Sequence, residues 1–195
     1  IRASEARFYQ KVREILSLSQ DHDPKSQAAQ GFYAVIQNKM LHAVTGHTAA
    51  ELIVARANAD RTNMGLTAWK GSRVRKGDVA TAKNYLDEKE LSDLNLIVTM
   101  FLDTADLRAR RRQTMLLADW EVVLDGFLRS NELPLLMNAG TVSAAQAEKT
   151  AFERYELFDA KRNEQLAAGE AGDIAELERI AGTRHTPKTN KGKHA

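Results

Sequence analysis

Polar side chains that could do chemistry are concentrated between residues 38 and 84. A histidine exchanges protons near neutral pH, a carboxylate can act as a general base, and Arg or Lys can hold a phosphate. This segment contains all of these types, and the candidate catalytic residues are His42, Glu51, Arg56 and Lys83. Because catalysis requires them to converge on one site, the sequence leaves open whether the chain is an enzyme.

Cleavage of RNA without a metal is one chemistry that this segment could support. Helical ribonucleases of the HEPN type place an Arg, a polar residue and a His within one or two turns of a helix. Gln37, Asn38 and His42 have this spacing, but Gln37 stands where the Arg is required, so the phosphate would lack its main counter-charge. A nuclease or phosphate-directed toxin that uses His42 as acid or base is therefore the alternative function. Its phosphate clamps would be Lys70, Lys76 or Arg56.

A metal site is a second chemistry to consider. His42, His47 and Glu51 could approach one another across the turn at Gly46, and two histidines with a carboxylate can hold zinc or iron. However, Thr48 and Glu51 have the spacing of a capping box, which explains Glu51 without a metal. We therefore expect neither a metal nor another cofactor.

Two clusters of basic residues could contact a phosphate backbone or an acidic partner. The first follows Trp69 and consists of Lys70, Arg73, Arg75 and Lys76. The second lies at the end of a predicted helix and consists of Arg108, Arg110, Arg111 and Arg112. An aromatic ring beside positive charges is typical of nucleic-acid binding, although a solvated loop whose Trp69 docks into the core explains the first cluster equally well. The helix dipole favours the second cluster, but four arginines in five residues exceed that requirement.

Helices must position these residues, because the chain is rich in helix-forming residues and has three prolines. Apolar residues recur at three- and four-residue intervals and predict about seven helices, near 2–18, 25–45, 48–58, 78–86, 88–112, 119–130 and 143–168. Capping boxes or close variants mark three of the starts, at Thr48, Asp87 and Ser143. The segment 60–77 is interrupted by glycines and is compatible with a short β-hairpin near 64–76. The expected fold is therefore an all-α bundle with a long C-terminal helix.

Composition limits the class of protein. Of 195 residues, 43% are hydrophobic and 28% are charged, which fits a soluble helical domain, and the net charge of +2 is too small to indicate nucleic-acid binding by itself. The absence of cysteine excludes disulfides and fits a cytoplasmic protein. No apolar run is long enough for a membrane helix. We expect a helical domain over 1–168, followed over 169–195 by a short helix and a basic, flexible tail.

Five stretches of the chain carry a resemblance to a known family. They are RFYQKVREI (7–15), FYAVIQNKMLHAVTGHTAAELIVARA (32–57), NMGLTAWKGSRVRKGDVATAKNYL (63–86), ELSDLNLIVTMFLDTADLRA (90–109) and DWEVVLDGFL (119–128). In these stretches the chain resembles the C-terminal region of the virulence RhuM family. The resemblance implies a helical domain of a bacterial protein carried on mobile genetic elements. It also implies a DNA-binding segment N-terminal to this domain, which agrees with a chain that begins at Ile1 and reads as helix from its start.

These observations lead to one principal hypothesis about function. We expect an assembly or partner-binding domain that forms a homo-oligomer, most simply a dimer, through the second half of its long C-terminal helix. Contact with nucleic acid would be direct, through the basic clusters, or indirect, through the N-terminal segment. No membrane partner is expected.

Overall fold

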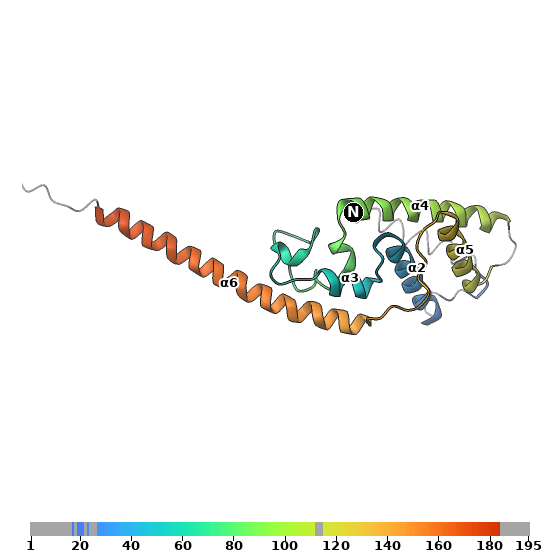
Figure 1. Ribbon diagram of the computed structural model, residues 1–195, viewed down its shortest axis with the longest axis horizontal. Coiled ribbons are helices and arrows are strands. Elements are labelled where there is room, and N and C mark those ends of the chain that lie inside the picture. Colours follow the sequence, from blue (N-terminus) through green and yellow to red (C-terminus); the bar gives the residue numbers. More distant parts are fainter. Residues whose placement is uncertain (1–16, 18, 22, 24–26, 112–114, 184–195) are drawn as a thin grey trace, which may run out of the picture. The chain divides into compact units, whose positions relative to one another are not determined.

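The computed structural model describes residues 17, 19–21, 23, 27–111 and 115–183. This part of the chain forms five α-helices, which are α2 (Gln27–Thr45), α3 (Ala49–Arg56), α4 (Glu88–Arg111), α5 (Leu117–Ser130) and α6 (Ala144–Thr183) (Figure 1). Two short 3-10 helices, η1 (Thr62–Gly65) and η2 (Ala82–Tyr85), lie between α3 and α4. The described residues contain no strand, and an isolated bridge joins Ser19 to Met115. The mostly helical fold class is therefore confirmed.

The prediction of about seven helices needs correction. The predicted helix at 2–18 lies outside the described residues, apart from Ser17. The predicted helix at 78–86 is wrong, because this segment is a turn followed by η2.

The β-hairpin near 64–76 is also wrong, because this segment continues η1 into bends and turns. Four residues of this segment have left-handed backbone conformations, with φ of 52° at Asn63, 59° at Met64, 80° at Gly65 and 89° at Gly71. These positive φ values turn the chain and interrupt an extended strand. A Cβ atom on Gly65 would lie 2.6 Å from the carbonyl oxygen of Arg56, so only glycine allows this close approach.

The main core forms where α2 packs against α3, α4 and α5, and where α4 packs against α5. Large buried side chains from these helices fill it: Ile36, Met40, Leu41, Leu52, Phe101, Trp120, Leu124 and Leu128. The rings of Phe101 and Phe127 pack at 5.7 Å between centroids, and the indole N–H of Trp120 donates to the buried Ser19 hydroxyl at 2.9 Å. The apolar residues that recur at three- and four-residue intervals in these helices therefore supply the core, although Val35 of α2 is 36% exposed.

A buried ion pair joins α2 to α5. The side chain of Lys39 is 8% exposed, and its Nζ lies 2.7 Å from Asp125 Oδ1 and 3.1 Å from Glu121 Oε1. Burial alone would lower the pKa of Lys39, but the bonds to Asp125 and Glu121 outweigh it, so the pKa lies above its ordinary value. Lys39 therefore stays charged, and its role is to hold α2 against α5.

The chain divides into two compact units, one up to Tyr155 and one from Glu156 onward. In the first unit, Ala147 and Ala151 of α6 are fully buried, and Arg154 Nη1 donates to the carbonyl oxygens of Val54 at 2.6 Å and Ala57 at 2.7 Å. This arginine satisfies carbonyl groups at the C-terminal end of α3. α6 continues to Thr183, beyond its predicted end at 168, whereas the predicted domain boundary at 168 stays a prediction. Among the described helices, none has both the length and the apolar character that crossing a membrane requires.

Candidate functional site

Glu51 is held by hydrogen bonds on both carboxylate oxygens. Its Oε2 accepts from the backbone N–H and the hydroxyl of Thr48, both at 2.9 Å, and forms the predicted capping box at the start of α3. Its Oε1 accepts from the backbone N–H of Thr141 at 2.7 Å and from its hydroxyl at 2.8 Å. The backbone bonds of Thr141 and Thr48 lower the pKa of Glu51 from 4.5 to about 2. Glu51 is therefore a weak base that ties the loop before α6 to α3.

Arg56 is engaged at the other end of α3. Its Nη1 and Nη2 donate to the two carboxylate oxygens of Glu90 at 2.6 and 2.5 Å, and Nη1 also donates to the carbonyl oxygen of Tyr85 at 2.8 Å. Glu90 also forms the predicted capping box of α4 with Asp87. The N–H of Asp87 donates to Glu90 Oε2 at 3.0 Å, and the N–H of Glu90 donates to Asp87 Oδ1 at 2.8 Å. The hydrogen bond to Glu90 raises the pKa of Arg56 and lowers that of Glu90. Arg56 therefore fastens α3 to the start of α4.

His42 lies in the last turn of α2, and His47 lies in the following loop. Within the described part of the chain, the Nδ1 atom of His42 is buried and has no hydrogen-bond partner. The Nδ1 atom of His47 lies 2.8 Å from the carbonyl oxygen of Thr45. No group of three or more His, Asp or Glu side chains among the described residues is arranged to hold a metal ion.

Lys83 lines two cavities that the other catalytic candidates do not share. One, of about 560 Å³, lies among α3, η2 and the first turns of α6. The other, of about 580 Å³, lies between the 67–70 segment, η2 and the start of α4. Neither is lined by His42, Glu51 or Arg56.

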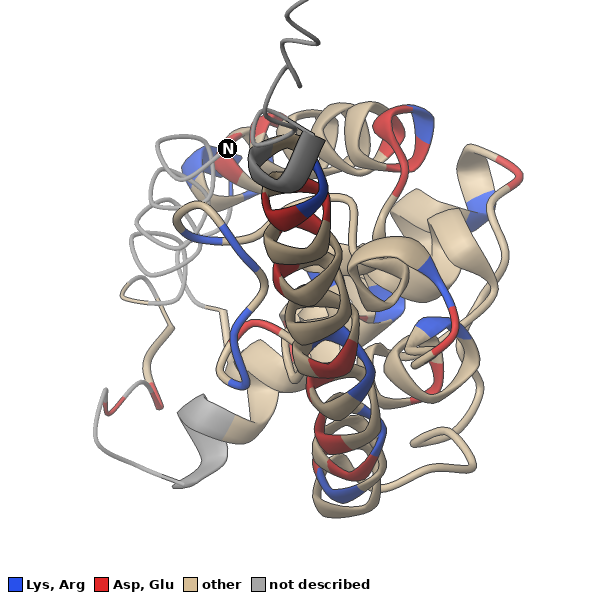
Figure 2. Ribbon diagram, turned by 90° about the vertical axis from the view of Figure 1, so that its left-hand side faces the viewer, with Lys and Arg blue, Asp and Glu red and all other residues tan. Residues whose placement is uncertain are grey.

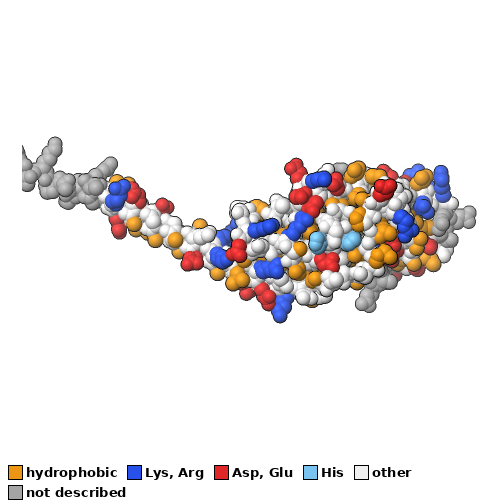
Figure 3. All heavy atoms as spheres, in the orientation of Figure 1, with side chains coloured by type: hydrophobic (Ala, Val, Ile, Leu, Met, Phe, Trp, Pro, Cys, Tyr) orange, Lys and Arg blue, Asp and Glu red, His pale blue; other side chains and the backbone are white. Residues whose placement is uncertain are grey.

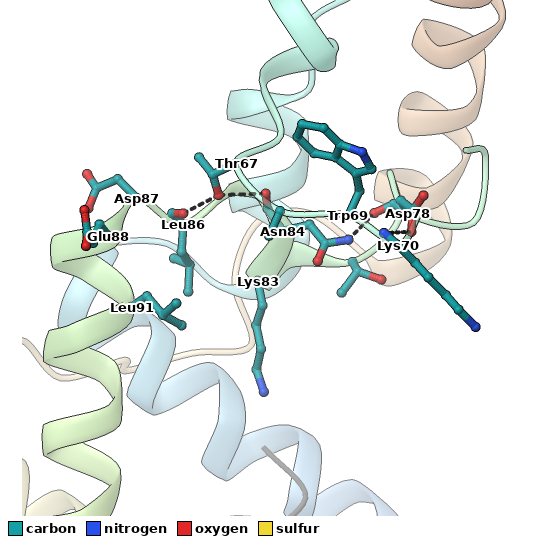
Figure 4. A pocket seen from close by; sticks show the side chains of 12 residues that line it. Thr67, Trp69, Lys70, Asp78, Lys83, Asn84, Leu86, Asp87, Glu88 and Leu91 are labelled. Carbon is teal, nitrogen blue, oxygen red and sulfur yellow. Dashed lines mark hydrogen bonds between the residues drawn. The ribbon is translucent and has the colours of Figure 1, made fainter. Parts of the chain in front are cut away.

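The second cavity, which we call the Trp69 cavity, is shown in Figure 4. It is lined by Thr67, Ala68, Trp69, Lys70, Asp78, Thr81, Lys83, Asn84, Leu86, Asp87, Glu88 and Leu91. Thr67 fixes one wall to η2, because its N–H donates to the carbonyl oxygen of Asn84 at 2.8 Å and its hydroxyl donates to that of Leu86 at 2.5 Å. The sequence analysis singled out Trp69, Lys70 and Lys83 but missed Thr67, which has no distinctive local signal.

Asp78 organises the basic segment beside this cavity. Its Oδ1 accepts from the N–H of Lys70 at 3.3 Å, and its Oδ2 accepts from the N–H of Arg75 at 2.9 Å. The carbonyl oxygen of Asp78 also accepts from the side-chain amide of Asn84 at 2.8 Å. One carboxylate therefore closes the turn between Lys70 and Arg75, and all the basic residues of the first cluster are exposed. Basic side chains are visible over the segment between α3 and α4 in Figure 3.

The second basic cluster lies at the C-terminal end of α4. Arg108, Arg110 and Arg111 are exposed, whereas Arg112 lies outside the described residues. Arg110 pairs with Asp106 at 2.8 Å, one helical turn away. Arg108 borders a groove of about 560 Å³ between α4 and α5. The structure thus separates this cluster from the Trp69 cavity, with which it shares no lining residue.

The second unit contains a helical surface with exposed apolar side chains. Along α6 beyond Glu156 the large apolar residues are exposed as follows: Leu157 60%, Leu166 57%, Ile174 58%, Leu177 66% and Ile180 44%. The charged residues between them are mainly acidic, and both acidic and basic side chains are coloured along the helix in Figure 2. Every described side chain from Asn163 to Ile180 is exposed.

Comparison with known families confirms the resemblance that the five stretches of sequence carry. The model of the Virulence protein RhuM family matches residues 1–166. No curated protein and no solved structure gives a significant match to the chain.

Proposed function

The chain belongs to the Virulence protein RhuM family, and from this premise we propose that it is a non-catalytic assembly domain that pairs with a second copy of itself through α6. The observation that carries the proposal is the exposed apolar surface of α6 between Leu166 and Ile180. An isolated helix in water is only marginally stable, and most helices in proteins are stabilised by packing of an apolar face. A second copy of the helix would supply that packing.

The spacing of these side chains suits a narrow contact between two helices. At 3.6 residues per turn, Leu166, Ile174 and Leu177 project within an arc of about 80°. Glu170 interrupts this surface, so the contact is short. Covering the exposed part of each side chain contributes about 1 kcal/mol, or about 6 kcal/mol for three residues in two copies. Part of this is lost to the entropy of association, so we expect a weak dimer with a dissociation constant of roughly 0.1 to 1 mM.

Sedimentation equilibrium between 10 µM and 1 mM tests this proposal. The Leu177→Glu variant should raise the dissociation constant by roughly thirtyfold, because it removes about 1 kcal/mol from each copy. Ala175→Glu is the matched control, since it adds the same charge on the opposite side of the same helical turn, and it should leave the dimer unchanged. A strict monomer at 1 mM, or equal effects of the two substitutions, would refute pairing through this surface.

The proposal includes a DNA-binding segment N-terminal to this domain, as the family resemblance implies. Pairing through α6 would then bring two such segments together, and each would strengthen the attachment of the other to DNA. In a protein that carries this segment, Leu177→Glu should weaken DNA binding while Ala175→Glu does not. Equal DNA affinity of the two variants would show that pairing through α6 does not contribute to DNA binding.

The alternative is a nuclease or phosphate-directed toxin that uses His42. It would require Glu51 and Arg56 to exchange the bonds described above for bonds to a substrate. Wild-type protein and the His42→Ala variant, incubated with labelled duplex DNA and with total tRNA, distinguish the two functions on denaturing gels. Cleavage by the wild type alone would make the chain an enzyme, and intact nucleic acid in both samples would favour the assembly domain.

A further inference from the structure

The Trp69 cavity has the dimensions and the lining of a ligand site. Its volume of about 580 Å³ falls within the range of small-molecule pockets, roughly 300 to 1,000 Å³. An aromatic ring, apolar side chains and several polar groups line it. The N–H groups of Thr67 and Ala68 donate to the carbonyl oxygen of Asn84, and the Thr67 hydroxyl donates to that of Leu86, so the walls made by the 67–70 segment and η2 are joined before any ligand arrives.

Trp69 is available to a ligand, in contrast to the other tryptophan of the chain. Trp120 is 1% exposed and is bonded to Ser19, so it belongs to the core. Trp69 is half-buried and forms part of the cavity wall (Figure 4). An indole ring that keeps one part accessible can stack on a nucleic-acid base, because every base has a flat π-face.

Charged side chains on different sides of the cavity would orientate a bound ligand. Asp87 and Glu88 border it at the start of α4, where they would repel a phosphate. Lys70 and Asp78 border the opposite part, as Figure 4 shows, and the Asp78 carboxylate accepts from the N–H groups of Lys70 and Arg75. The exposed Arg73 and Arg75 follow in the turn that Asp78 closes. A strand whose base lies on Trp69 would therefore direct its phosphates towards Lys70, Arg73 and Arg75.

We propose that the Trp69 cavity binds single-stranded nucleic acid, with one unpaired base stacked on Trp69 and the neighbouring phosphates held by Lys70, Arg73 and Arg75. A duplex fits less well, because its bases are already stacked on one another. This binding is independent of pairing through α6 and does not require it.

Fluorescence of the 195-residue chain provides a direct readout, because Trp69 is the accessible one of two tryptophans. Titration with a 20-residue oligothymidylate should quench the accessible part of the emission. A fluorescein-labelled copy of the same strand gives the dissociation constant by anisotropy. Trp69→Leu should weaken binding by roughly tenfold or more, since stacking on one aromatic ring accounts for that much affinity. Far-UV circular dichroism verifies that the variant is folded.

A pair of triple variants separates this site from general electrostatic attraction. The first replaces Lys70, Arg73 and Arg75 with Gln, and it should lower the dependence of log affinity on log salt by about 2. The matched control replaces Arg108, Arg110 and Arg111 with Gln. It removes the same charge from the end of α4 and should leave affinity and salt dependence nearly unchanged.

Several results would overturn the proposal. They are equal losses in the two triple variants, unchanged binding by Trp69→Leu, or tighter binding of a 20-base-pair duplex than of the single strand. Competition by an acidic peptide as effective as that by the oligonucleotide would indicate a protein ligand instead. Equal affinities for thymidine monophosphate and for the strand would reduce the site to one for a free nucleotide.

Discussion

Neutralising Glu51 should destabilise the first unit in a manner that depends on pH. The substitution Glu51→Gln keeps the size of the side chain but removes the charge that four hydrogen bonds from Thr48 and Thr141 stabilise. A shift of the carboxyl pKa from 4.5 to about 2 corresponds to about 3 kcal/mol at neutral pH. Since the bonds to Thr141 are exposed to solvent, we expect a smaller loss of about 1 to 2 kcal/mol in the free energy of unfolding.

The sign of the pH dependence follows from the direction of the shift. The pKa of Glu51 is lower in the folded chain than in the unfolded chain, so its contribution is complete above pH 4.5 and is lost as the pH falls towards 2. Roughly 60% of it is lost by pH 3. The difference in stability between wild type and Glu51→Gln should therefore shrink by more than half between pH 7 and pH 3.

Urea denaturation followed by circular dichroism at pH 7, 5, 4 and 3 measures this difference. Glu153→Gln is the matched control, because Glu153 is 63% exposed and lies 3.9 Å from Lys149, a pair that contributes only a few tenths of a kcal/mol. A difference that is the same at pH 7 and pH 3 would refute the assignment of the low pKa to Glu51. Equal effects of the two substitutions would refute the structural role of its hydrogen bonds.

Three further substitutions test the packing of the first unit by the same denaturation measurement. Gly140→Ala should lower the free energy of unfolding by about 1 to 3 kcal/mol, because Gly140 has a φ of 86° and a Cβ atom there would lie 2.8 Å from Thr48 Cγ2. An unchanged free energy of unfolding would contradict this close approach. Gly126→Ala should instead stabilise the chain by about 0.5 to 1 kcal/mol, since Gly126 lies inside α5 and an added Cβ atom meets no atom within 4 Å; destabilisation would contradict the open space. Arg56→Gln should cost about 2 kcal/mol, because it leaves the partly buried carboxylate of Glu90 without its charged partner; a loss below 0.5 kcal/mol would show that the pair acts as an ordinary surface ion pair.

Local signals in the sequence were sufficient for the main helices and for several of their starts. The capping boxes at Thr48–Glu51 and Asp87–Glu90 form as predicted, because each depends on residues only three positions apart. The same kind of reasoning failed between α3 and α4. There, backbone bonds from Thr67 and Ala68 to Asn84, 17 and 16 residues away, replace both the predicted hairpin and the predicted helix.

The sequence by itself therefore determined the helical class, the family and the set of polar residues available for function. The tertiary structure alone decided how those residues are used. Glu51 and Arg56 have side chains suited to catalysis, but partners 90 and 34 residues away, Thr141 and Glu90, hold them in structural roles. Trp69 and Trp120 are the same residue type, yet one lines a cavity and the other fills the core. Composition and spacing specify only what lies nearby along the chain, whereas these roles depend on which distant segments the packed core brings together.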